Sequence, residues 1–181
     1  MKKAWIVAVL AFAAFTAVAA DKATPRTYAA GDAGTFAMSV PAGWTDRVEQ
    51  PQPGAPATIT LGPGKGKPFQ VMVTPISPAK AKAPVSTPGD IRTAVQRVAD
   101  DIKPQAVEKA IPLVELKGAA GSGFYFSVTD KAPKPGEFKY MTQGILKVGE
   151  LTVSFTILTN DGQAKVRKDA LAMLAGATRG K

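Results

Sequence analysis

Alternation of apolar and polar residues recurs along most of the chain and predicts β-strands. The clearest run covers residues 151–157, where Leu151, Val153, Phe155 and Ile157 alternate with two threonines and a serine. Strands with one apolar and one polar phase usually pair antiparallel and bury one face strongly. The same alternation, or a short apolar run, marks residues 36–40, 57–61, 69–73, 111–116, 124–129 and 138–148.

Two turns and two longer loops separate these strands. Gly149 and Glu150 stand between two alternating runs, so they are expected to form a tight two-residue hairpin turn. Residues 62–67 are expected to form the mobile tip of a second hairpin. Residues 49–56 and 76–87 are rich in proline and are predicted to be loops.

The first predicted helix begins at Thr87, which has the chemistry of an N-cap. Pro88 follows at the first helical position, and Asp90 falls in the first turn, where the helix dipole favours negative charge. Pro104 is expected to end or kink this helix at Lys103. The apolar stripe at helical spacing consists of Ile91, Val95, Val98 and Ile102.

A second helix is predicted near the end of the chain. Asn160 or Asp161 is the expected N-cap, and Gln163 is placed to reach back to Asn160 as its capping-box partner. Gly176 is the expected C-terminal stop. The apolar stripe of this helix consists of Val166, Ala170, Met173 and Leu174.

The predicted order of elements is therefore β-β-β-α-β-β-β-β-α. Each helix has one apolar stripe, so both helices need a sheet to pack against. The expected fold class is α+β, with a single antiparallel sheet of about six or seven strands and two main helices packed on it.

The first residues have the layout of a secretory signal peptide. Two lysines precede an apolar stretch, and small residues follow it, with cleavage expected after Ala19 or Ala20. An uncleaved membrane anchor is the alternative, but the apolar run of about 15 residues is shorter than the roughly 20 that span a bilayer. The predicted division is a cleaved signal peptide (residues 1–20), a flexible mature N-terminus (residues 21–34) and one domain (residues 35–181).

Composition supports a single exported domain that is stabilised without disulfide bonds. The chain contains no cysteine, which excludes disulfides and a lipoprotein anchor. Residues 21–181 carry 21 basic and 14 acidic side chains, a net charge of +7. This charge agrees either with simple solubility or with attraction to an anionic envelope surface. We favour solubility, because the basic residues are scattered along the sequence.

The inventory of reactive side chains argues against catalysis. The chain has neither histidine nor cysteine, so the usual general base, the thiolate nucleophile and most transition-metal sites are excluded. Ser77 and Lys80 match the S-x-x-K spacing of penicillin-binding proteins, but the companion motifs are missing and a solvated linker is the better interpretation. No catalytic residue, cofactor or metal ligand is predicted.

Five residues form the candidate partner-binding set. Trp44, with Arg47 close by in the sequence, either packs into the core at the edge of the sheet or is exposed as an anchor for a partner. Lys131, Lys134 and Lys139 crowd one loop and the strand that follows it, as a basic patch or as ordinary solvated charges.

Several segments resemble the PsbP-like superfamily, which includes bacterial envelope proteins. They are FAMSVPAGW at residues 36–44, Gly-x-Tyr-x-Ser at 123–127, and LTVSFTILT at 151–159 before a final helix with Ala170 and Leu171. The resemblance implies an antiparallel sheet with helices packed across it. It also implies a binding or assembly role without naming a partner, and it brings no catalytic signature.

The expected function is that of an exported, soluble, non-enzymatic domain that binds or assembles another envelope protein. One alternative is a carrier or sensor of a small or anionic ligand, such as a lipid or polymer fragment, which requires an apolar pocket. A Ser-Lys hydrolase at Ser77 and Lys80 is a remote alternative. The expected location is the periplasm if the source is a double-membraned bacterium, with no nucleic-acid partner and no transmembrane segment in the mature protein.

Overall fold

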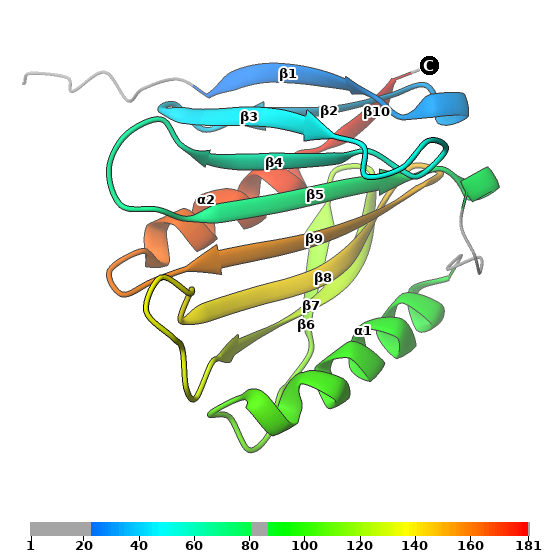
Figure 1. Cartoon of the computed structure of the whole chain (residues 1–181). Coiled ribbons are helices and arrows are strands. Elements are labelled where there is room, and N and C mark those ends of the chain that lie inside the picture. Colours follow the sequence, from blue (N-terminus) through cyan, green and yellow to red (C-terminus); the bar gives the residue numbers. More distant parts are fainter. Residues whose placement is uncertain (1–22, 81–86, 181) are drawn as a thin grey trace, which may run out of the picture.

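The computed structural model describes residues 23–80 and 87–180, which form two antiparallel sheets and two α-helices (Figure 1). The helices are α1 (Pro88–Ile102) and α2 (Ala164–Ala175). The larger sheet has seven strands in the order β3 (Trp44–Glu49), β4 (Thr58–Pro63), β5 (Gln70–Ile76), β9 (Leu151–Thr159), β8 (Tyr140–Val148), β7 (Gly121–Thr129) and β6 (Val114–Gly118). The smaller sheet has the order β1 (Thr24–Ala29), β2 (Thr35–Val40) and β10 (Thr178–Gly180).

The α+β class and the antiparallel pairing are confirmed, and the larger sheet has the expected size. The strands are divided between two sheets, however, whereas a single sheet was expected. The sequence did not separate them, because strands of both sheets contribute apolar side chains to the same core.

The expectation of a flexible tail over residues 21–34 is wrong for its larger part. Residues 24–29 form β1, which pairs with β2 along its whole length, and residues Gly31–Ala33 form the short 3-10 helix η1. Tyr28 is the one side chain of β1 that is buried, at 8% exposure. A strand with a single inward residue has no visible alternation, which explains why the sequence pattern missed it.

Two further strands were also missed, for the same kind of reason. β3 is an edge strand with mostly exposed side chains, so it lacks an apolar phase. β10 has three residues and closely follows the C-cap Gly176. Neither strand buries enough side chains to leave a periodic pattern in the sequence.

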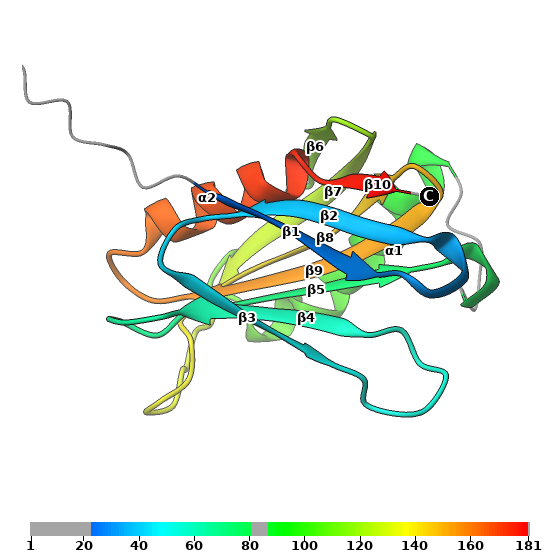
Figure 2. The ribbon, with the colours of Figure 1, turned by 90° about the horizontal axis from the view of Figure 1, so that it is seen from above.

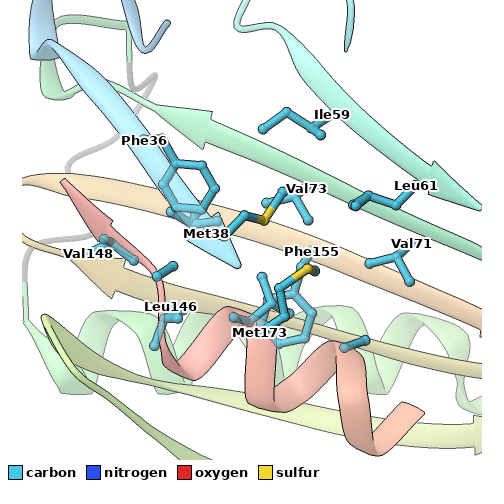
Figure 3. Packing of buried hydrophobic residues seen from close by; sticks show 14 of the residues in the cluster. Phe36, Met38, Ile59, Leu61, Val71, Val73, Leu146, Val148, Phe155 and Met173 are labelled. Carbon is cyan, nitrogen blue, oxygen red and sulfur yellow. The ribbon is translucent and has the colours of Figure 1, made fainter. Parts of the chain in front are cut away.

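The two helices cover opposite faces of the larger sheet, as Figures 1 and 2 show. The smaller sheet and α2 lie on one face and enclose the main core, which is drawn in Figure 3. α1 lies on the other face, where Ile91, Val95 and Ala99 pack against Phe126 and Val128 in a second core. We call these two faces of the larger sheet the α2 face and the α1 face.

The start of α1 follows the prediction from the sequence. The Thr87 hydroxyl accepts a hydrogen bond from the Asp90 amide at 3.1 Å, and the Asp90 carboxylate accepts one from the Thr87 amide at 2.9 Å. This reciprocal pair is a capping box, with Pro88 at the first helical position. The helix ends at Ile102 with Lys103 as its C-cap, as Pro104 predicted, and continues as the 3-10 turn η3 (Lys103–Gln105).

The start of α2 differs from the prediction. Gln163, not Asn160 or Asp161, is the N-cap, and its side chain makes no cap hydrogen bond. Gln163 does reach back, since its Oε1 accepts a 2.7 Å hydrogen bond from the Asn160 amide. The Asn160 side chain is unable to cap α2 because it accepts a hydrogen bond from the Lys139 amide instead.

The predicted hairpin between β8 and β9 is confirmed. Val148 and Leu151 face each other, and Gly149 occupies the first turn position with a positive φ of 59°. Because neighbouring strands of the larger sheet run in opposite directions, the β4–β5 turn, the end of β7, the start of β8 and the end of β9 all lie at the same end of the sheet (Figure 1).

Candidate functional site

Four segments far apart in the sequence meet at this end of the sheet. They are the end of β4 with the β4–β5 turn (residues 62–69), the region after α1 (residues 103–109), the β7–β8 loop (residues 130–139) and the β9–α2 connection with the first five residues of α2 (residues 160–168). We call these four segments together the loop end. In Figure 1 they lie on the left, and three of the five candidate residues, Lys131, Lys134 and Lys139, belong to them.

Gln163 holds two parts of the loop end together. Its Nε2 donates hydrogen bonds to the carbonyls of Lys67 at 3.3 Å and Pro68 at 3.0 Å, while its Oε1 accepts from Asn160. The side chain is 7% exposed, so these hydrogen bonds are shielded from water. Gln163 thus fixes the β4–β5 turn against the start of α2. Sequence reasoning gave it only a role in helix capping.

The Asn160 and Asp161 side chains fix the β7–β8 loop at the same place. Asn160 Oδ1 accepts a 3.0 Å hydrogen bond from the Lys139 amide. The Asp161 carboxylate contacts Lys139 Nζ at 3.1 Å and accepts a 2.7 Å hydrogen bond from the Tyr140 hydroxyl. The hydrogen bonds from Tyr140 and then Lys139 lower the pKa of Asp161, and the bond to Asp161 raises the pKa of Lys139. Lys139 therefore stays charged and paired.

Glu108 attaches the segment after α1 to the end of β7. Its carboxylate accepts hydrogen bonds from the Thr129 amide at 2.9 and 3.1 Å and from the Thr129 hydroxyl at 2.8 Å. Burial by itself would raise the pKa of Glu108, but the hydrogen bonds from Thr129 outweigh it and lower the pKa. All four segments of the loop end are thus held in place by specific hydrogen bonds.

A two-part groove opens on the α1 face beside the loop end. Its first part, of about 370 Å³, is lined by Arg47, Thr60, Gln70 and Phe138 among others. Its second part, of about 560 Å³, shares Gln70 and Phe138 with the first. The apolar lining of this second part includes Ile102, Val128, Met141 and Leu158. We call the two parts together the Phe138 groove.

The structure brings two of the five candidate residues to this groove and separates the others. Arg47 lines its first part, and Lys139 lines its second part. Arg47 also pairs with Glu49 at 2.8 Å. The Lys131 ammonium donates a hydrogen bond to the Pro104 carbonyl, and Lys134 is exposed on the β7–β8 loop.

Trp44 lies on the opposite face of the sheet from Arg47. It is half-buried and packs against Phe69, with ring centroids 4.6 Å apart and planes tilted by 52°. It contributes to the main core on the α2 face. Residues three apart on a strand point to opposite faces, so Trp44 and Arg47 do not form one contact surface. The signal that was missed for the groove is Phe138, an aromatic side chain between the charged residues Glu137 and Lys139.

The hydrolase alternative gains no support from the position of Ser77. Ser77 is 3% exposed, and its hydroxyl has no hydrogen-bond partner among the described residues. Ser77 lines a cavity of about 200 Å³ together with Gln50 and Pro75, but its hydroxyl oxygen is buried. A serine nucleophile has to be reached by its substrate. The side chain of Lys80 lies outside the described residues, as does the predicted signal peptide.

Two further properties concern the described part of the chain. Residues 23–80 and 87–180 contain no group of three or more His, Cys, Asp or Glu side chains arranged to hold a metal ion. Within the same ranges, neither helix has the length and apolar character needed to cross a membrane.

Comparison with known proteins relates the chain to others through its fold. No family model and no curated protein matches the sequence. A crystal structure from Bacteroides thetaiotaomicron VPI-5482 matches 81% of this chain, with a TM-score of 0.52 and 11% identity, and the chain spans 45% of that protein. The solution structure of cyanobacterial PsbP (CyanoP) from Synechocystis sp. PCC 6803 matches 87% of this chain and 94% of its own length, with a TM-score of 0.51 and 10% identity. The chain has a PsbP-like fold, as its sequence motifs predicted.

Proposed function

We propose that this chain is an exported, non-enzymatic binding or assembly factor that engages another envelope protein through the Phe138 groove. The composition of the groove carries the proposal. Aliphatic side chains from α1, β7, β8 and β9 form its floor beside Phe138, and Arg47 and Lys139 stand among its lining. An apolar centre with an aromatic anchor and polar surroundings is the usual anatomy of a protein interface.

Export is supported by residues 1–20, which have a basic start, an apolar stretch and small residues before Asp21. The absence of cysteine agrees with an unlipidated protein in the periplasm. Mass spectrometry of exported material checks this part of the proposal. A mature terminus at Ala20 or Asp21 is expected, and an intact Met1 would contradict it.

A non-enzymatic role is supported by the available side chains. Neither histidine nor cysteine is present, and the hydroxyl of the one serine with a catalytic-type spacing to a lysine is buried. The loops of the loop end are fixed against one another by side-chain hydrogen bonds of four residues, Gln163, Asn160, Asp161 and Glu108. Rigid loops reduce the entropy that binding has to overcome, so this arrangement suits recognition.

Site-specific photo-crosslinking in the native envelope tests the groove. A photoreactive phenylalanine analogue replaces Phe138, and the same analogue replaces Val114 as a control, because Val114 is an exposed apolar residue on the edge strand β6. One dominant protein adduct is expected from position 138 and none from position 114. Adding Met141→Glu, which places a charge in the apolar floor, should abolish the adduct.

Identical adducts from both positions, or an adduct that survives Met141→Glu, would place the partner elsewhere. Circular dichroism of each variant separates a lost contact from a lost fold. The carrier alternative predicts a different result, namely a bound small molecule in native mass spectra of the exported protein and no protein adduct.

A further inference from the structure

The loop end carries nearly all of the net positive charge of the exported chain. Its four segments contain ten Lys or Arg and four Asp or Glu, a net charge of +6, and three further carboxylates closely flank these segments, those of Asp100, Asp101 and Asp169. Residues 21–181 together have a net charge of +7, so the rest of that chain is close to neutral. The basic residues are scattered in the sequence, but the fold collects them at one end.

Most of these charges face solvent without a carboxylate partner. Among the described residues, only Lys139 and Lys165 of the ten lie within 4.0 Å of a carboxylate, that of Asp161 and Asp169 respectively. Lys139 is half-buried, and the other nine cations are exposed. An excess of solvated charge of one sign creates a field that attracts an oppositely charged surface.

The type of cation indicates what kind of surface fits. Nine of the ten are lysines, and Arg167 is the single arginine. Arginine recognises one carboxylate or phosphate with a two-pronged hydrogen bond, whereas lysine acts as a mobile point charge. Lysines spread over four loops therefore suit a layer of many anionic groups better than one specific anionic ligand.

An exposed apolar side chain stands within this basic region. Val107 is 59% exposed and lies between Lys103 and Lys109 along the chain. Its backbone is fixed, because its amide donates a 2.9 Å hydrogen bond to the Thr129 carbonyl. Exposed apolar side chains near lysines are typical of proteins that rest at the interface of an anionic bilayer.

From the charge asymmetry, the lysine content and Val107, we propose that the loop end docks on the surface of an anionic phospholipid bilayer. The Phe138 groove shares Lys139 and other β7–β8 loop residues with the loop end, so docking would bring the groove close to the membrane. This inference goes beyond the proposed partner function and does not depend on it, since vesicles contain no protein.

Co-sedimentation with vesicles tests the proposal, using the exported protein with its N-terminus established by mass spectrometry. Binding is expected to vesicles of phosphatidylglycerol mixed with phosphatidylcholine and not to pure phosphatidylcholine. It should disappear at about 0.5 M salt, where the Debye length falls to a few ångströms. Each lysine near such a surface strengthens binding about fivefold, so Lys65→Glu with Lys134→Glu should weaken it at least about 25-fold.

The matched control is Arg92→Glu with Lys117→Glu, which changes the net charge equally at exposed positions outside the loop end. This variant should bind within about twofold of the unchanged protein, because charges beyond the Debye length are screened. Equal weakening by both variants would mean that net charge alone acts, and would overturn the proposal. Equal binding to neutral vesicles would indicate insertion of an apolar segment and would also overturn it. Binding to soluble polyglutamate but not to vesicles would overturn it too, and would assign the loop end to an acidic protein instead.

Discussion

The hydroxyl of Tyr28 donates a 2.9 Å hydrogen bond to the carboxylate of Asp46 and so connects the smaller sheet to the edge of the larger one. Tyr28 lies in β1 and Asp46 in β3, two strands that the sequence pattern did not reveal. Arg26 adds an ion pair to the same carboxylate at 3.7 Å. β1 and β3 are each held by backbone pairing with a neighbouring strand, and this contact adds a side-chain link between the two sheets.

We expect Tyr28→Phe to lower the free energy of unfolding by about 1–2 kcal/mol, because the charged acceptor Asp46 loses its donor while Arg26 still compensates part of the loss. Urea unfolding measures this change. In a double-mutant cycle with Asp46→Ala, the two effects should be clearly less than additive. Full additivity would show that the hydrogen bond does not join the sheets.

Tyr28 should also make the protein sensitive to alkali. Burial first, and then the hydrogen bond to Asp46, raise the pKa of Tyr28 above its ordinary value of 10.0. A raised pKa stabilises the fold fully below the ordinary value, and this contribution is lost as the pH rises toward the folded-state pKa. Unfolding free energies measured from neutral pH to above pH 10 should therefore fall more steeply for the unchanged protein than for Tyr28→Phe. Parallel curves would contradict this assignment.

We expect Gln163→Ala to loosen the loop end and to destabilise the protein by about 1–3 kcal/mol, since buried backbone groups lose their partners. The carbonyls of Lys67 and Pro68 and the amide of Asn160 are the groups affected. Hydrogen exchange should become faster in the β4–β5 turn and at the start of α2, with little change in α1.

The matched control for Gln163→Ala is Gln96→Ala. Gln96 Nε2 donates a hydrogen bond to Asp100 on the exposed side of α1, so its removal should change stability by less than about 0.5 kcal/mol. Comparable losses from both substitutions would argue against a special role for Gln163.

Glu108 should contribute to stability at neutral pH and lose this contribution in acid. Its pKa is lowered from the ordinary 4.5, so the stabilisation is present above that value and disappears as the pH falls through the folded-state pKa. Glu108→Gln should cost about 1 kcal/mol at neutral pH, a value that allows for screening by solvent. The difference from the unchanged protein should shrink as unfolding is measured at pH values below 4.5.

Glu115→Gln serves as the control for Glu108→Gln, because Glu115 is exposed on the edge strand β6 and its replacement changes the net charge equally. A pH-independent difference for Glu108→Gln would show that the hydrogen bonds from Thr129 do not depend on the charge of the carboxylate.

Gly144 should tolerate no side chain. It lies in β8 between Tyr125 and Phe155, and an added Cβ would be 2.4 Å from the Phe124 carbonyl oxygen and 2.7 Å from the Phe155 ring. Gly144→Ala is expected to cost at least about 2 kcal/mol or to prevent folding, because the close neighbours are backbone and core.

The control for Gly144→Ala is Gly89→Ala in the first turn of α1. Its nearest neighbour would be the Thr87 hydroxyl oxygen at 3.6 Å, an ordinary contact. Alanine has the higher helix propensity, so stability should stay the same or rise by up to about 1 kcal/mol. Equal losses at the two positions would show that space around Gly144 is not the deciding factor.

Local chemistry was sufficient to predict the main elements of the fold. The capping box of α1 needs only Thr87 and Asp90 at their spacing, and the β8–β9 turn needs only a glycine between two alternating runs. The pattern failed for β1 and β3, which are held by backbone pairing with β2 and β4 and by the contact between Tyr28 and Asp46 rather than by an apolar face. It also failed for Asn160, whose side chain is taken by Lys139 from another loop.

The sequence by itself determined the α+β class, the start of α1, the β8–β9 hairpin and the absence of histidine and cysteine. Each of these depends on neighbours in the chain or on composition alone. Only the tertiary structure decided that Trp44 and Arg47 point to opposite faces and that Phe138 shares a groove with both Arg47 and Lys139. It also decided the distribution of charge. Lysines from residues 62–69, 103–109, 130–139 and 160–168 look scattered in the sequence, but the alternating directions of antiparallel strands bring these segments to one end of the sheet.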